Sequence, residues 1–204
     1  MTDEVAAFVE VVDNLYGVYL DAGLGFMAIA KQVCEGQDKV RGEFPPGTDL
    51  DALPQFIGRG SPNDAGNVMQ HKTTQGQFKA RNAKGGHNQV LLGQMLLVLL
   101  YEHWESEHRA RVAAAIGIPR KDLKASLFGD LRLVRNDIIH CRGIIQEKTI
   151  EKLEVVQGLV VGEVLRLSED AVEETVRAIK RVLDNLVVEH GGEDPKHRTV
   201  WRVR

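Results

Sequence analysis

Hydrophobic residues recur at helical spacing in four long stretches of the chain. In one of them the apolar positions alternate between spacings of four and three residues, as they do on one face of an α-helix. This stripe consists of Leu127, Leu131, Val134, Ile138, Cys141 and Ile145, within a helix expected from Lys121 to about Gln146. Similar stripes predict helices from Thr2 to about Cys34, from Asn88 to about Gly117 and from Ser168 to Gly191. The pattern therefore predicts an all-α fold, a helical bundle.

The helical pattern stops between residues 36 and 87. Turn-forming residues such as Pro45-Pro46-Gly47 and Gly85-Gly86 interrupt this stretch. We expect a loop-rich insertion between the first helix and the central helices, with a helical turn at Asp51–Ile57 and a short helix at Val68–Ala80. The whole chain, residues 1–204, is expected to form one domain that includes this insertion.

Two further details concern glycines. Gly23 and Gly25 are expected to break or kink the first helix and to leave Phe26–Val33 as a second piece. Between 153 and 167, β-branched residues surround Gly158 and Gly162. That composition fits a short β-hairpin at 153–167, and it competes with an extension of the preceding helix into residues 147–155.

Polar residues stand inside the 121–146 helix, off its apolar stripe. They are Arg135, Asn136, Asp137 and His140. Asn and Asp are poor interior helix residues because their side chains compete for the backbone. The run R-N-D-I-I-H resembles the Arg-x(4–6)-His signature of the HEPN superfamily, whose members are all-α bundles and in many cases metal-independent endoribonucleases of toxin–antitoxin and phage-defence systems.

That resemblance implies RNA cleavage without a metal or cofactor. The 2′-hydroxyl of RNA attacks the adjacent phosphorus and leaves a 2′,3′-cyclic phosphate and a 5′-hydroxyl. His140 suits the proton transfers, Arg135 suits the charge developing on phosphorus, and Asn136 can hold either group. Asp137 and Glu105, which follows Trp104 on the preceding helix, are supporting candidates, Glu105 as the partner of a motif guanidinium or imidazole.

A second match to the same signature lies in the insertion. Residues Arg81 to His87 also satisfy Arg-x(5)-His, but the match contains Gly85-Gly86 and lacks helical periodicity. We interpret it as a coincidence in a loop.

The remaining site candidates are basic. Between Arg59 and His87 five cationic residues stand against one carboxylate. This stretch is either a solvated loop or an arm that contacts phosphates. The RNA-binding candidates are Lys72, Lys79, Arg81 and Lys84 in the insertion, with Arg132 and Arg142 on either side of the motif.

The helical angle bears on oligomeric state. At about 100° per residue, Asn136 and His140 share one strip of the helix, whereas Arg135 lies about 140° from His140. Either the helix is distorted, or a second copy completes the site. HEPN domains commonly form two-fold dimers in which both motifs face one cleft. The resemblance therefore implies a homodimer in which Arg135 of one copy approaches His140 of the other.

Composition limits the alternatives. The net charge is −3, so RNA binding would have to be local. Two cysteines and no Cys–His cluster argue against disulfides and metal sites. No signal peptide or membrane span is visible, and we expect a cytoplasmic protein. The basic tail from 193 to 204 contains Trp201, which is expected to dock on the bundle, on a partner or on a base.

Two other functions remain open besides the ribonuclease. One is a HEPN-like module without nuclease activity that binds RNA, a nucleotide or a protein, such as an antitoxin. The other is a helical dimerisation module. The intact set of Arg135, Asn136 and His140 favours the ribonuclease.

Overall fold

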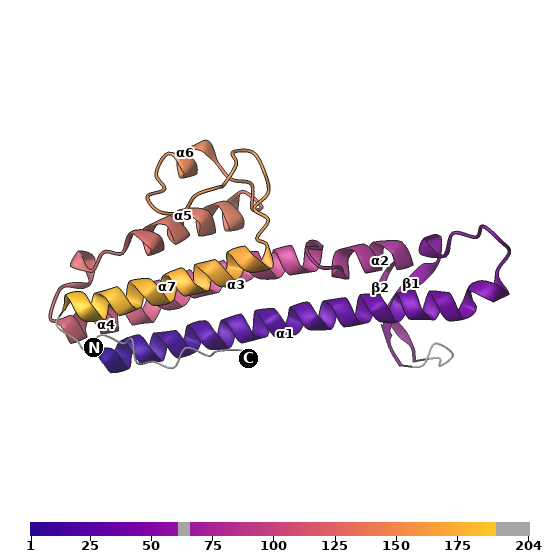
Figure 1. Ribbon diagram of the computed structural model, residues 1–204, viewed down its shortest axis with the longest axis horizontal. Helices are drawn as coiled ribbons and strands as arrows, with labels where there is room; N and C mark the ends of the chain where they lie inside the picture. Colours follow the sequence, from indigo (N-terminus) through magenta and orange to yellow (C-terminus); the bar gives the residue numbers. More distant parts are fainter. Residues whose placement is uncertain (61–65, 191–204) are drawn as a thin grey trace. The chain divides into compact units, whose positions relative to one another are not determined.

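The computed structural model describes residues 1–60 and 66–190, and its contacts divide the chain into two compact units (Figure 1). The first unit contains Met1–Tyr19 and the chain from Leu92 onward, and the second contains Leu20–Leu91. Helix α1 (Thr2–Val40) begins in the first unit and ends in the second. Helix α3 (His87–His103) begins in the second and continues in the first.

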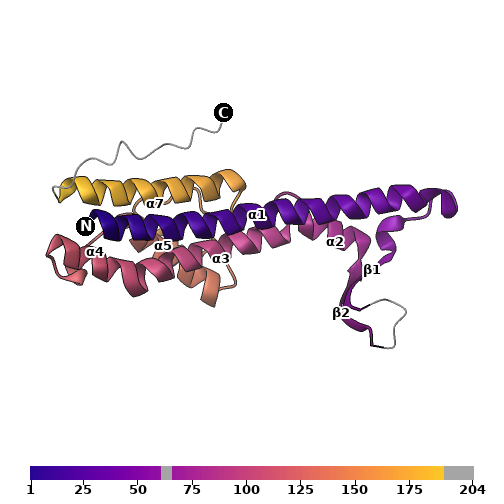
Figure 2. The ribbon, with the colours of Figure 1, turned by 90° about the horizontal axis from the view of Figure 1, so that it is seen from below.

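The first unit is a helical bundle. Helix α7 (Glu169–Glu189) runs beside the first part of α1 (Figure 2). After α3 the elements are the π-helical turn η3 (Trp104–His108), α4 (Arg109–Ile116), the 3-10 turn η4 (Arg120–Asp122), α5 (Ser126–His140), the short α6 (Glu147–Ile150) and α7 (Glu169–Glu189). An ion pair between Lys180 and Asp13 joins α7 to α1.

Aromatic rings from three elements form the centre of this bundle. Phe8 of α1 is completely buried, and its ring centroid lies 5.4 Å from that of Trp104 and 6.0 Å from that of Phe128. Trp104 and Phe128 stack with 4.1 Å between centroids. These contacts fix α5, the helix with the Arg-His motif, against α1 and η3.

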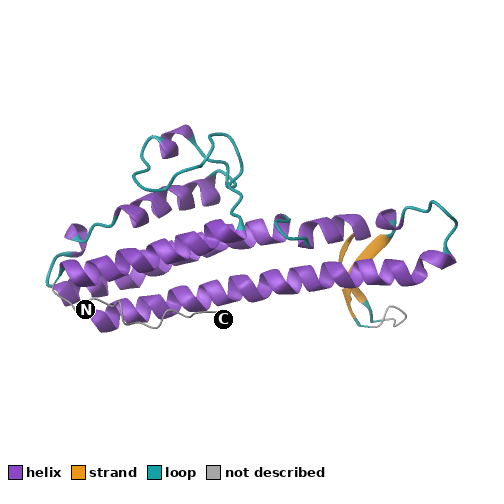
Figure 3. Ribbon diagram, in the orientation of Figure 1, coloured by secondary structure: helices purple, strands orange, loops and turns teal. Residues whose placement is uncertain are grey.

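The second unit combines the end of α1 with a small antiparallel hairpin. Its other elements are η1 (Arg41–Glu43), η2 (Leu50–Ala52), β1 (Pro54–Arg59), β2 (Val68–Thr74) and α2 (Gln75–Asn82) (Figure 3). Pro54 pairs with Thr74, and the register shifts between Ile57 and Gly58. The Thr74 hydroxyl accepts the amide N–H of Gln77, and the Gln77 side chain accepts that of Thr74, so the end of β2 also caps α2.

The all-α prediction with a short β-hairpin is confirmed, but the hairpin lies elsewhere. Residues 153–167 form no strand, and their pairing is a single bridge between Ile144 and Val164. The competing extension of the motif helix into residues 147–155 is also wrong, because α5 ends at His140 and α6 is a separate helix. The side chain of Asp130 accepts hydrogen bonds from the backbone N–H groups of residues 154–156. These N–H groups are therefore paired with a carboxylate and not with the backbone of a neighbouring strand. The short helix expected at Val68–Ala80 is instead β2 followed by α2.

Helix lengths also differ from the prediction. The break at Gly23 and Gly25 is wrong, because α1 runs without interruption to Val40. A glycine costs a helix only about 1 kcal/mol relative to alanine, which does not break a helix of this length. Helix α5 ends at His140 rather than near Gln146, since Arg142 and Gly143 take φ values of 56° and 76°.

For the last helix the structure tests the predicted start but not the predicted end. The Ser168 side chain accepts the N–H of Ala171, which confirms it as the N-cap of α7. The predicted stop at Gly191, the tail from 193 to 204 and Trp201 lie outside the described residues.

Candidate functional site

Arg135 is held by a carboxylate from the neighbouring helix. Its Nη2 lies 2.6 Å from Oε1 of Glu102 on α3, and its Nη1 donates to Oδ1 of Asn136 at 3.1 Å. About a quarter of the Arg135 side chain is exposed, 27%. The guanidinium therefore has a fixed direction and still borders solvent.

His140 lies at the C-terminal end of α5 and is exposed. It lines a hollow of about 450 Å³ together with Asn136. The other residues around this hollow are Leu133, Asp137, Cys141, Lys148, Thr149 and Lys152. We call it the His140 hollow. Arg135 is not among the lining residues, so one chain brings Asn136 and His140 together but directs Arg135 elsewhere.

Asp137, the third residue of the motif run, holds the backbone. It is buried, and its Oδ2 accepts the N–H of Gln146 at 2.9 Å. Its carbonyl oxygen also accepts the N–H groups of Cys141 and Gly143. Asp137 therefore closes the C-terminal end of α5 and fixes the chain that follows.

Asp130, two helical turns earlier on α5, also holds a later part of the chain, and it was not among the predicted site residues. Its carboxylate is 1% exposed and accepts N–H groups of Glu154, Val155 and Val156 at 2.8 to 3.1 Å. Asp130 and Asp137 are seven residues apart, which places them on one face of α5. The available signal was a second aspartate inside an amphipathic helix, next to its apolar stripe.

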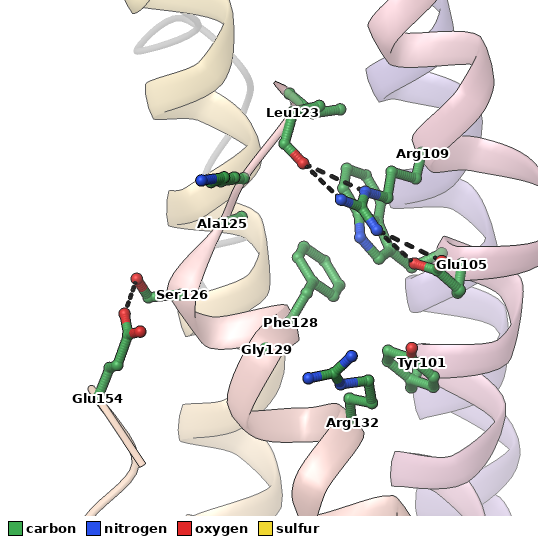
Figure 4. Close-up of a pocket in the computed structure, with 12 residues that line it drawn as sticks. Tyr101, Glu105, Arg109, Leu123, Ala125, Ser126, Phe128, Gly129, Arg132 and Glu154 are labelled. Atoms are coloured by element: carbon green, nitrogen blue, oxygen red, sulfur yellow. Dashed lines mark hydrogen bonds and ion pairs between the residues drawn. The ribbon is translucent and has the colours of Figure 1, made fainter. Parts of the chain in front are cut away.

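Glu105 does not reach the motif, contrary to its expected role. Its carboxylate pairs with Arg109 at 3.0 Å and with Arg120 at 2.6 Å (Figure 4 draws the contact with Arg109). Glu105 lies inside the π-helical turn η3, whose wider turn changes the direction of its side chains relative to α3. The carboxylate that holds the motif guanidinium is Glu102, just before this turn.

Arg132 borders a second hollow, of about 300 Å³, at the other end of α5 (Figure 4). Tyr101 lines the same hollow and faces Arg132. Burial, above all other causes, raises the pKa of the Tyr101 hydroxyl above its ordinary value. Arg132 is exposed and makes no ion pair with a described residue, and Arg142 is exposed just beyond α5. Both remain available to an anionic ligand.

The basic candidates of the insertion belong to the second unit, and all four interact with other groups of the chain. Lys79 lies 2.5 Å from Asp51 and donates to Gln37 at 2.8 Å. The hydrogen bond from Lys79 lowers the pKa of Asp51, and the same bond raises the pKa of Lys79. The Arg81 guanidinium lies 2.7 Å from His71, and the Lys72 ammonium lies 5.7 Å from the Phe56 ring centroid. Lys84, the fourth, lies in the turn after α2.

Comparison with known proteins adds no relative. No family model matches the chain, and no curated protein or solved structure matches it. Within residues 1–60 and 66–190, no three His, Cys, Asp or Glu side chains are grouped so that they could hold a metal ion. None of the helices in these ranges has the length and apolar character needed to cross a membrane.

Proposed function

We propose that this protein is a metal-independent endoribonuclease of the HEPN type that acts as a homodimer, in a toxin–antitoxin or phage-defence setting. The observation that supports it best is the division of the motif on α5. His140 and Asn136 line one hollow, while Arg135 is held on another side of the helix by Glu102. A two-fold dimer that brings the Arg135 side of one copy to the His140 hollow of the other would complete each site.

The chemistry needs no group beyond these side chains, the RNA and water. The 2′-oxygen forms a bond to phosphorus as the bond from phosphorus to the 5′-oxygen breaks, which gives a cyclic phosphate and a 5′-hydroxyl. One proton leaves the 2′-hydroxyl and one joins the leaving 5′-oxygen. The His140 imidazole carries out one of these transfers, because its ring nitrogens can accept and donate a proton, and water carries out the other. The Arg135 fork donates hydrogen bonds to the phosphate oxygens while charge accumulates on them.

The direct test is cleavage of a mixed RNA pool in EDTA by purified wild type, His140→Ala and His190→Ala. His190 is a matched control, because it is also exposed at the C-terminal end of a helix of the same unit. We expect wild type and His190→Ala to leave 2′,3′-cyclic phosphate ends and His140→Ala to leave none. Equal cleavage by all three would show that His140 is not involved.

One observation favours a second candidate, a HEPN-like binding module without nuclease activity. In the single chain Arg135 is already paired with Glu102 at 2.6 Å, and a phosphate would have to compete with that carboxylate. If wild type cuts no RNA in the same assay, the binding module becomes the better proposal. A Glu102→Gln variant separates the two, because it releases Arg135 from this pair. A nuclease limited by the pairing should cut RNA faster in this variant, whereas a binding module should gain affinity for RNA and still cut none.

A further inference from the structure

Two lysines line the His140 hollow and have no part in the chemistry proposed above. Lys148 lies in the short helix α6 and Lys152 in the turn that follows it, and both line the hollow. Both are exposed, and neither makes an ion pair with a described residue. They share the hollow with Asn136 and His140, two of the three motif residues that would meet RNA.

The segment with these lysines is fixed on both sides by buried carboxylates of α5. Asp137 accepts the N–H of Gln146, two residues before Lys148. Asp130 accepts the N–H of Glu154, two residues after Lys152. Between them, the N–H of Lys152 donates to the carbonyl of Thr149 at 3.0 Å. The lysines are thus presented at a defined place beside His140.

The charges of the hollow are unbalanced. The two lysine ammonium groups at this hollow repel each other, because they carry like charges. The one carboxylate in the lining, Asp137, is 2% exposed and accepts a backbone N–H. A bound anion would remove the repulsion between the ammonium groups, and an ammonium binds phosphate as a point charge.

From this arrangement we infer that Lys148 and Lys152 bind the backbone phosphates of single-stranded RNA next to the linkage that is cut. The inference rests on the proposed ribonuclease function and names how that site holds its substrate. Lys148 and Lys152 bind without regard to base identity, since they meet the phosphates and not the base edges. Their contribution is to position the RNA backbone against His140.

The test measures binding separately from cleavage. The probe is a short single-stranded RNA with 2′-O-methyl groups throughout, which lacks the attacking hydroxyl and cannot be cut. Its affinity is measured over a range of salt concentrations for wild type and for Lys148→Gln with Lys152→Gln. The control replaces Lys39 and Lys121 by Gln, two exposed lysines outside the hollow without ion pairs to described residues.

We expect the hollow variant to bind about tenfold more weakly at low salt, and its salt slope to fall by about 1.4, which is about 0.7 for each lysine that no longer neutralises a phosphate. The control should match wild type, and Lys148→Arg with Lys152→Arg should retain binding because the charges remain. With a cleavable RNA, the hollow variant should show a raised KM with little change in kcat.

The outcomes separate this inference from the proposed function. Binding that depends on Lys148 and Lys152 in a protein that cuts no RNA would support the inference and end the nuclease proposal. Cleavage at wild-type KM by the hollow variant would end the inference and leave the nuclease proposal intact. Equal decreases in affinity in the hollow variant and the control, or no binding by wild type, would also overturn the inference.

Discussion

The chain contains the Arg-His signature twice, and the two copies have different surroundings. Arg81 to His87 covers the end of α2, a turn and the first residue of α3. Asn82 of this copy is 1% exposed; its amide donates to the carbonyl of Phe78, and its Oδ1 accepts from Asn88. At Gly86 a Cβ atom would lie 2.6 Å from the carbonyl oxygen of Ala80, so the tight turn requires glycine there.

The copy from Arg135 to His140 lies within one regular helix. Asn136 and His140 are exposed and line one hollow, and Arg135 is oriented by a carboxylate of another helix. In the first copy the residues complete a turn, whereas in the second they leave polar groups available to a ligand. A short motif is therefore better evidence of a functional site where its side chains are not needed to complete the fold.

The largest expected difference is in catalysis by the two arginines. Arg135→Ala should lower the rate of RNA cleavage by about 10²- to 10³-fold, because a donor to the developing phosphate charge is removed. Arg81→Ala should leave the rate unchanged, since its guanidinium contacts His71 and the Phe78 ring. Single-turnover cleavage of a labelled RNA measures both. A comparable decrease in Arg81→Ala would remove the distinction between the two copies.

For stability the order of the two copies is reversed, so that Asn82 of the first copy should matter more than Asn136 of the second. Asn82→Ala should lower the free energy of unfolding by about 1 to 3 kcal/mol, because a buried amide that joins Phe78 and Asn88 is removed. Asn136→Ala should change it by less than about 0.5 kcal/mol, as is usual at exposed positions. Urea unfolding followed by circular dichroism gives both values. A larger decrease in the free energy of unfolding for Asn136→Ala would mean that this side chain stabilises the fold.

The smallest effect concerns His108, which contrasts with the exposed His140. His108 is 4% exposed, its Nδ1 has no hydrogen-bond partner among the described groups, and its ring packs 4.9 Å from that of Phe8. Burial lowers the pKa of His108 below its ordinary value of 6.5. The unfolded chain therefore binds this proton more readily, and the stabilisation present above pH 6.5 is lost as the pH falls toward the lower, folded pKa.

Unfolding free energies between pH 5 and pH 7 check that expectation. Wild type and His140→Gln should become less stable toward acid, and His108→Gln should show a flatter dependence whatever its absolute stability. An unchanged slope in His108→Gln would assign the acid sensitivity to other groups.

Local signals predicted part of this architecture well. The apolar stripe of α5 is buried at Leu127, Leu131 and Val134, and Ser168 caps α7 as expected, because periodicity and capping act over a few residues. The fixed loop at 154–156 was missed, since it depends on Asp130, 24 to 26 residues earlier in the chain. The hairpin of β1 and β2 was missed because its apolar residues, such as Phe56 and Met69, are exposed and follow no alternation toward a core.

The candidate site could likewise be predicted only in part. Helical spacing predicts that Asn136 and His140 share a strip and that Arg135 does not, and the lining of the His140 hollow agrees. Glu102 in place of Glu105 could not be predicted, because a π-helical turn leaves no periodic signal in so short a segment. The place of Lys148 and Lys152 beside His140 could not be predicted either, since it depends on hydrogen bonds from this segment to two buried carboxylates of α5, between residues 9 and 24 positions apart.

The most direct test of the composite site mixes two inactive variants. Arg135→Ala and His140→Ala are purified separately, each is assayed in EDTA, and the two are then refolded together to form mixed dimers. If Arg135 of one copy serves His140 of the other, one of the two sites in each mixed dimer is intact, and the mixture should regain about a quarter of wild-type cleavage. A mixture that forms mixed dimers and stays as inactive as its components would contradict the account.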